Sequence, residues 1–301
     1  MLKKHLSWAS FPSKLRPALN ITGAILGLAG VAFVCIKISQ QLPEIRQYSF
    51  DKSHILLFSM LAVVYGSANS FLAAGWHLIL KRLGVNLNWK LSMSAYGISQ
   101  LAKYVPGNIF QFVGRQALGV SVGIPGGKLA KSAIIEIIFL VIAAMLLSIQ
   151  AVQLWLPHLS GSATFLTISL LIVVCFCVLL LRKETLLSRT LLFNMFFFIT
   201  SGLVFWGVVS SLTDHSIEIT QISKISSAFI FAWLLGFLTP GAPAGLGVRE
   251  YIILTSLTGI ASEPLLLLSV IVSRVITMGG DMIFYSAAVT VKIFTDKSRA
   301  D

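Results

Sequence analysis

The chain has 301 residues, of which 56% are hydrophobic and only 11% are charged, and its mean hydropathy is +0.88. A single soluble core is too small to bury that much apolar surface, which excludes an ordinary soluble enzyme or binding domain. The formal charge of +12 does not indicate a nucleic-acid binder, because the cations lie in short loops between apolar runs. The composition therefore predicts an all-α, multi-pass integral membrane protein.

Six apolar runs are long enough to cross a bilayer, whose hydrocarbon core of about 30 Å requires about 20 helical residues. Two further apolar stretches contain a Pro-Gly break. A broken helix survives at membrane depth only where protein or a wet cavity satisfies the freed backbone groups, so we interpret both stretches as re-entrant hairpins. In chain order the expected elements are residues 19–38, 54–80, hairpin A (91–123), 129–155, 162–181, 189–212, hairpin B (222–260) and 265–291.

An alternative interpretation treats both broken stretches as ordinary helices with proline kinks, which gives eight spans and no symmetry. That arrangement places Lys128 and Lys131 on the outer face, which the positive-inside rule disfavours. With two hairpins, most cations in short loops fall on one side of the membrane, which the positive-inside rule assigns to the cytoplasm. We therefore expect a protein of the bacterial inner membrane with both termini in the cytoplasm.

The two broken stretches repeat one another in residue order. Each has a Pro-Gly pair and an arginine nine residues after the proline: Pro106, Gly107 and Arg115, then Pro240, Gly241 and Arg249. Each half then holds three spans and one hairpin, and an odd number of spans makes the second half start on the opposite side. We therefore predict one polytopic domain over residues 1–301, with inverted halves at approximately 17–155 and 162–291. Paired interruptions of this kind are typical of a transport site near the membrane midplane.

Charged residues at membrane depth are candidate functional groups, because each costs at least about 2.5 kcal/mol on insertion scales. At a rise of 1.5 Å per residue, Glu136 and Arg274 are expected at similar depths, and we predict that they pair across the interface between the halves. The pair is either a structural lock or part of a substrate path. Asp281 is expected to join Arg274 in a wider network, and Lys103 to reach the interface as an anchor.

Arg115 and Arg249 each follow a break, near a helix N-terminus whose amides and dipole favour anions. A guanidinium binds a phosphate through two hydrogen bonds, and Asn108 offers an amide. The alternatives are a cytoplasmic anchor for Arg115 and a local pair with Glu250 for Arg249. Glycines at the breaks allow close approach of the backbone to a ligand; they are Gly107, Gly241, Gly245 and Gly247.

Signals for enzymatic chemistry are nearly absent from the sequence. No nucleophile-elbow, nucleotide-binding or zinc-protease motif is found, and the five histidines are scattered without metal-ligand spacing. The three cysteines lie inside apolar runs, which indicates packing and not a disulfide framework. We therefore expect neither an enzyme nor a cofactor nor a metal site.

Four segments in order resemble the lysylphosphatidylglycerol synthase transmembrane, or flippase-like, family over about residues 19–291: SQLAKYVPGNIFQFVGRQALGVSVGIP, SAIIEI, LTPGAPAGLGVREYIILTSLTGI and VIVSRVITMGGD. The third is the most specific, since the family shows a Pro-Gly pair and a Gly-Leu-Gly-Val-x-Glu run that here ends at Glu250. The family's intramembrane Glu-Arg pair falls on Glu136, where Ile137 replaces the arginine. This departure favours Arg274 as the partner of Glu136.

The resemblance implies movement of a lipid between leaflets, either an aminoacylated phospholipid or a polyprenyl-linked sugar, without the soluble aminoacyl-transferase domain that synthesises lysyl-lipid. We therefore predict a flippase-like transporter of an anionic lipid or a polyprenyl-phosphate-linked glycolipid. The alternative is a membrane enzyme or accessory subunit of a polysaccharide or lipid pathway. The expected partners are membrane lipids and a lipid-linked substrate, and no nucleic acid is expected. The chain is further expected to associate either with a second copy of itself, as a homodimer, or with an enzyme of lipid or polysaccharide biosynthesis.

Overall fold

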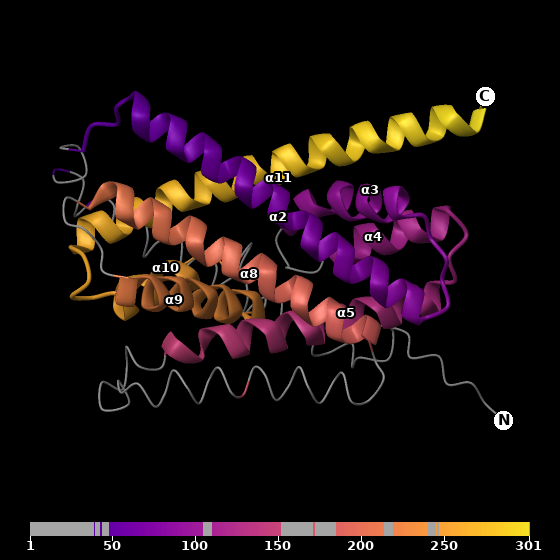
Figure 1. Ribbon diagram of the computed structural model, residues 1–301, viewed down its shortest axis with the longest axis horizontal. Helices are drawn as coiled ribbons and strands as arrows, with labels where there is room; N and C mark the ends of the chain where they lie inside the picture. Colours follow the sequence, from indigo (N-terminus) through magenta and orange to yellow (C-terminus); the bar gives the residue numbers. More distant parts are fainter. Residues whose placement is uncertain are drawn as a thin grey trace.

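The computed structural model describes residues 39, 43, 48–104, 110–151, 171, 185–213, 219–239, 245 and 247–300. Over these ranges the chain is built from helices and contains no strand (Figure 1). Five of the helices are long and apolar enough to cross a membrane. The all-α membrane architecture predicted from composition is therefore supported by the arrangement of the described residues.

Four of the five long helices coincide with predicted spans. They are α2 (Lys52–Arg82), α5 (Gly126–Ser148), α8 (Thr185–Leu212) and α11 (Glu263–Ala300), and α5 continues into the short 3-10 helix η3 (Ile149–Ala151). The predicted runs 19–38 and 162–181 lie outside the described residues, apart from residue 171. The fifth long helix, α9 (Ile219–Leu238), was expected only as one arm of a hairpin.

Each Pro-Gly stretch contains one α-helix before the break and one after it. The first has α3 (Trp89–Gln100), the 3-10 helix η2 (Leu101–Tyr104) and α4 (Phe110–Ser121). The second has the 20-residue α9 and the nine-residue α10 (Val248–Ser256), so its arms are unequal. The two helices of each stretch pack against one another, since α3 contacts α4 and α9 contacts α10.

The two hairpins lie at opposite ends of the molecule. In Figure 1, α2 ends and α5 begins at the right-hand end, where α3 and α4 lie, whereas α8 ends and α11 begins at the left-hand end, near α9 and α10. The colour sequence shows that α2 and α8 run in opposite directions, as do α5 and α11.

The helix contacts follow the same two-fold correspondence. When α2, α3, α4 and α5 are matched in order to α8, α9, α10 and α11, the contact of α3 with α11 maps onto the contact of α9 with α5. The contact of α2 with α11 maps in the same way onto that of α8 with α5, and α2 packs directly on α8. The first arm of each hairpin therefore packs against the last span of the other half.

Small residues and aromatic rings form the packed interior. A Cβ on Gly66 of α2 would lie 2.7 Å from the carbonyl oxygen of Gly280 in α11, so two glycines allow these backbones to touch. Between α8 and α9, the ring of Phe198 lies edge-on to Trp233 at 4.7 Å between centroids. Because lipid tails are as apolar as these side chains, close packing of this kind is the main force that holds membrane helices together.

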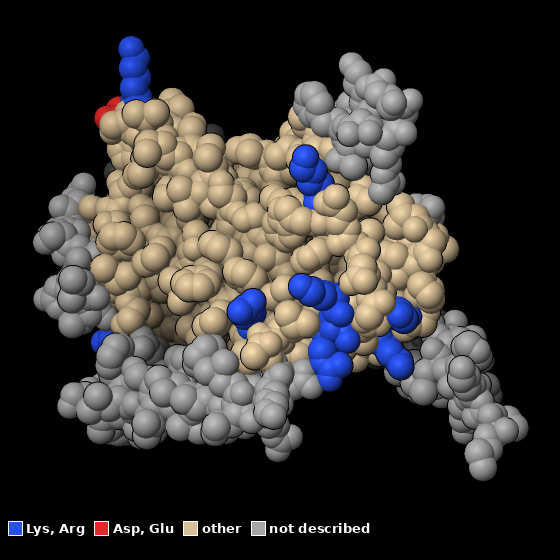
Figure 2. All heavy atoms as spheres, turned by 45° about the vertical axis from the view of Figure 1, so that its right-hand side comes forward, with Lys and Arg blue, Asp and Glu red and all other residues tan. Residues whose placement is uncertain are grey.

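The two ends of the molecule differ in charge. Basic residues occupy the last turn of α2 and the first turns of the helices that begin nearby: Lys81, Arg82, Lys90, Lys128 and Lys131. Figure 2 turns this end forward and shows several Lys and Arg side chains gathered there. The predicted orientation, with this end in the cytoplasm, depends on that asymmetry.

At the opposite end, α2 is capped by Asp51. Its carboxylate accepts hydrogen bonds from the backbone N–H of His54 and the hydroxyl of Ser53. The His54 bond is the largest cause of the lowered pKa of Asp51, which is about 2, and the bond from Ser53 adds to it. The cap fixes the point at which the long helix begins.

Candidate functional site

A cavity lies where both hairpins and the four long spans meet. Every described helix except η3 contributes residues to its wall. The volume of the cavity is about 70 Å³. A space of this size has room for several water molecules, since one water needs roughly 10–15 Å³. Four charged residues line it together with neutral polar groups and aromatic rings; the charged ones are Lys103, Glu136, Arg249 and Arg274.

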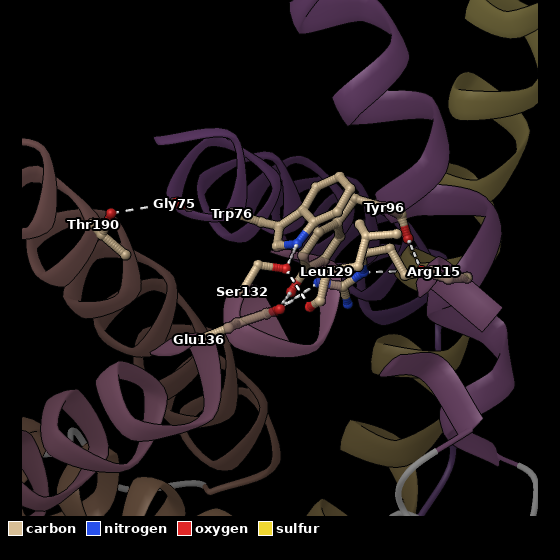
Figure 3. Close-up of polar contacts among 9 residues, drawn as sticks. Gly75, Trp76, Tyr96, Arg115, Leu129, Ser132, Glu136 and Thr190 are labelled. Carbon is tan, nitrogen blue, oxygen red and sulfur yellow. Dashed lines mark hydrogen bonds and ion pairs between the residues drawn. The ribbon is translucent and has the colours of Figure 1, made fainter. Parts of the chain in front are cut away.

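The first of three buried ion pairs joins α4 to α5 (Figure 3). Arg115 Nη1 donates to both carboxylate oxygens of Glu136, at 2.7 and 2.5 Å, and both side chains are almost fully buried. Tyr96 donates a hydrogen bond to the same carboxylate, and its ring centroid lies 3.7 Å from the guanidinium carbon. The rings of Trp76 and Phe112 enclose the other sides of Arg115. The second arm of hairpin A is thus fastened to the next span.

The second ion pair occupies the corresponding place in the other half. Arg274 in α11 lies 2.6 Å from Glu250 in α10, and its Nε donates to the same carboxylate oxygen at 2.8 Å. The other oxygen of Glu250 accepts the backbone N–H of Gly247, which caps α10. The second arm of hairpin B is fastened to the next span as in hairpin A, with the signs of the two charges exchanged.

The third ion pair connects the two halves. Lys103 in η2 lies 2.7 Å from Asp281 in α11, whose carboxylate is fully buried. Tyr104 and Asn69 also donate to Asp281, at 2.5 and 3.2 Å, and Gln100 donates to Asn69 at 3.0 Å. This network ties the end of the first arm of hairpin A to α2 and to the last span.

Arg249 differs from the other three cations of this site. It lines the cavity, and among the described residues no carboxylate forms an ion pair with it. Its guanidinium carbon lies 5.2 Å from the ring centroid of Phe229, and its stem passes Gly236 and Gly245. A Cβ on Gly245, whose φ is +70°, would lie 2.8 Å from the Cα of Gly236. Glycine at this position therefore allows the break to lie against α9 and leaves room for the arginine.

The predicted pair of Glu136 with Arg274 is wrong. Glu136 pairs with Arg115, and Arg274 pairs with Glu250, so both pairs form within a half and not between the halves. Both residues do line the same cavity. The rise per residue places them at a similar depth but says nothing of the direction in which each helix face points, and that direction selects the nearer partner.

Two further expectations are corrected by the network at Asp281. Asp281 pairs with Lys103 instead of joining Arg274, and Lys103 turns inward instead of reaching the interface. Sequence reasoning missed Tyr104, Asn69 and the cavity-lining Gln100 as members of this site. A polar side chain within an apolar run, as at Asn69, is the signal that indicates such a buried network.

The remaining predicted site residues belong to the two breaks. Gly245 and Gly247 have positive φ angles of 70° and 84°, which glycine adopts with little strain. The other break residues and the predicted amide lie outside the described residues: Pro106, Gly107, Asn108, Pro240 and Gly241.

Within the described ranges, no three His, Cys, Asp or Glu residues lie close enough together to hold a metal ion. A scan against protein-family models finds no match, and neither does a search of the curated proteins. A functional conclusion therefore depends on the chemistry of the cavity.

Proposed function

We propose that the chain is a flippase-like membrane transporter that moves an anionic lipid, or a polyprenyl-phosphate-linked glycolipid, between the two leaflets. The observation that carries this proposal is the position of Arg249, a cation without a described carboxylate partner in a cavity formed by both halves. A charge without a partner in the interior of a membrane protein is costly, so such a site favours binding of an anion.

The proposed architecture has six spans and two re-entrant hairpins in inverted halves, in a bacterial inner membrane with both termini in the cytoplasm. The antiparallel matching of α2 with α8 and of α5 with α11 supports it, as does the two-fold pattern of helix contacts. The resemblance of the same segments to the flippase-like family agrees with it. In transporters of this kind the site lies at the interface of the repeats, which is where the cavity is found.

In the proposed mechanism the lipid tails stay in the bilayer while the anionic headgroup enters the cavity and binds Arg249. Arg115 is already held by Glu136, so a single arginine takes the headgroup instead of the two that the repeat suggests. The ion pairs within each half make a hairpin arm and its neighbouring span move as one body. The pair of Lys103 with Asp281 between the halves is then the contact that opens when the halves rock.

The test is a transport assay with the purified protein in liposomes. Phosphatidylglycerol carries a fluorophore on its headgroup, and an impermeant reagent added outside reduces that fluorophore. The fraction of the labelled lipid that becomes accessible to the reagent is followed over time. The wild type should exceed empty liposomes, and Arg249→Ala should slow the change. Arg189→Ala is the matched control, because Arg189 is exposed on α8 away from the cavity.

The proposal fails if the wild type equals empty liposomes for anionic phospholipids and for polyprenyl-phosphate sugars alike. Binding of those lipids at Arg249 without transport would support the alternative, in which the cavity holds a lipid-linked substrate for an enzyme of a polysaccharide or lipid pathway.

A further inference from the structure

We infer that the ligand of this cavity carries one net negative charge, as a phosphodiester with a neutral headgroup that forms hydrogen bonds. This inference rests on the proposed function, because it specifies the lipid that the cavity accepts. It depends on the charges around the cavity, of which four are cations and three are carboxylates. They are Lys103, Arg115, Arg249 and Arg274, and Glu136, Glu250 and Asp281.

Each carboxylate is already bound by a cation and by at least one further donor. Glu136 has an arginine and a tyrosine, and Glu250 has an arginine and a backbone amide. Asp281 has a lysine, a tyrosine and an asparagine amide. A cationic headgroup therefore finds no available carboxylate unless an existing ion pair opens.

The two Pro-Gly breaks and the two apolar runs that lie outside the described residues add no charge to this balance. The breaks at residues 105–109 and 240–244, and the apolar runs 19–36 and 162–181, contain no Asp, Glu, Lys, Arg or His. Among the described residues, these seven charges are the ones that form the ion pairs and line the cavity. Their sum leaves one positive charge, at Arg249.

A ligand with one negative charge makes the occupied cavity neutral. A diphosphate brings at least two negative charges, which leaves a buried excess unless one of the ion pairs breaks, and breaking a buried pair is costly. A zwitterionic headgroup leaves the charge of Arg249 in place and also brings a cation with no available carboxylate. A phosphodiester with a neutral headgroup is the class that the charges favour.

The neutral part of the wall suits hydroxyl groups. Gln111 lies on α4, and Gln100 and Thr277 line the same cavity. Amide and hydroxyl groups donate and accept hydrogen bonds without adding charge, so they match a glycerol or sugar headgroup. The phosphodiester occurs in two sources, a phospholipid with a polyol headgroup and a sugar linked to a polyprenyl monophosphate, and the experiment separates them.

The experiment measures binding to the purified protein in detergent, by the shift of its thermal unfolding with soluble short-chain lipids. Dihexanoyl phosphatidylglycerol is compared with zwitterionic dihexanoyl phosphatidylcholine. For the polyprenyl source, citronellyl phosphoryl glucose is compared with citronellyl diphosphoryl glucose. At least one of the singly charged phosphodiesters should bind about tenfold more tightly than its counterpart in the same pair, and the pair that shows this preference identifies the source.

Two variants test whether charge balance causes the ranking. Arg249→Gln removes the positive excess and should bring the ratio within the preferred pair close to one. Gln111→Lys adds a second positive charge and should move the preference toward the diphosphate. Arg189→Gln, on the exposed face of α8, is the control and should leave the ranking unchanged.

The inference is overturned if the wild type binds the zwitterionic and diphosphate compounds as tightly as the phosphodiesters, or if Arg249→Gln keeps the original ranking. The liposome assay separates this failure from that of the proposed function. Ranked binding without transport contradicts the transporter and leaves the charge rule standing, whereas transport that ignores headgroup charge contradicts the charge rule alone.

Discussion

In hairpin A, Arg115 is buried among aromatic rings and held by both oxygens of Glu136, whereas in hairpin B, Arg249 faces the cavity with no described carboxylate beside it. Both arginines lie nine residues after the proline of their break. The difference follows from where each half carries its carboxylate. In the first half it lies on the span, as Glu136; in the second it lies on the hairpin arm, as Glu250, and takes Arg274 from the span.

The comparison shows that the two halves keep one structural contact and differ in the group left over. Each half fastens the second arm of its hairpin to the following span through an arginine and a glutamate. In the second half the charges of the pair are exchanged, so Arg249, which corresponds to Arg115, does not form this ion pair. Arg115 is thus a structural residue, and Arg249 is the residue that a ligand is proposed to meet.

The largest effect is expected when the lock in hairpin A is broken. Glu136→Leu leaves Arg115 buried without its carboxylate and should lower the free energy of unfolding by about 3–5 kcal/mol. The measurement is a denaturation titration in mixed micelles. The double variant Arg115→Met with Glu136→Leu should recover most of the loss, because an apolar pair replaces the ion pair. A double variant as unstable as the single one contradicts this account.

The contrast between the two arginines is tested next by Arg249→Ala. It should slow lipid transport roughly 10- to 150-fold, the equivalent of one hydrogen bond to a charged group at about 1.5–3 kcal/mol. It should change the free energy of unfolding by less than about 1 kcal/mol, since no ion pair is lost. Arg115→Ala in the same assays should mainly destabilise the protein. Equal losses of stability in both variants would show that Arg249 is also a lock.

A smaller effect is expected at the contact between the halves. Lys103→Met leaves Asp281 with the hydroxyl of Tyr104 and the amide of Asn69 as donors, so the loss of stability should be about 2 kcal/mol. Adding Asp281→Asn removes the remaining buried charge and should restore part of the loss. An unfolding titration of the three proteins measures this, and an unchanged midpoint for Lys103→Met would mean that the ion pair does not hold the halves.

The smallest effect concerns the glycine of the second break. Gly245→Ala requires a side chain at a φ of +70° and at 2.8 Å from Gly236, and should cost about 1–3 kcal/mol. Gly114→Ala in hairpin A is the matched control, because its new Cβ would meet only Ser99, at 3.8 Å, in a helix that favours alanine. Similar unfolding midpoints for the two variants would contradict the close approach of the break to α9.

The sequence predicted the helical membrane class, the two broken stretches and three of the four charged residues that line the cavity, which are Glu136, Arg249 and Arg274. Four predicted spans appear as helices that begin within four residues of their expected first residues, because apolar length is a strong signal in a membrane protein. The helix that forms the first arm of hairpin B begins at Ile219, three residues before the predicted start at 222, because its first turns are polar and do not belong to the apolar run. The family resemblance and the direction of transport stay predictions.

What the sequence by itself determined is which helices carry charged residues and how far along each helix these residues lie, because these follow from hydropathy and from the rise per residue. Only the tertiary structure decided which charges meet. Glu136 pairs with Arg115 and not with Arg274, and Asp281 pairs with Lys103, because the rotation and packing of the helices set the distances between side chains. Depth is a local property of the chain, whereas partnership depends on which helix faces come together.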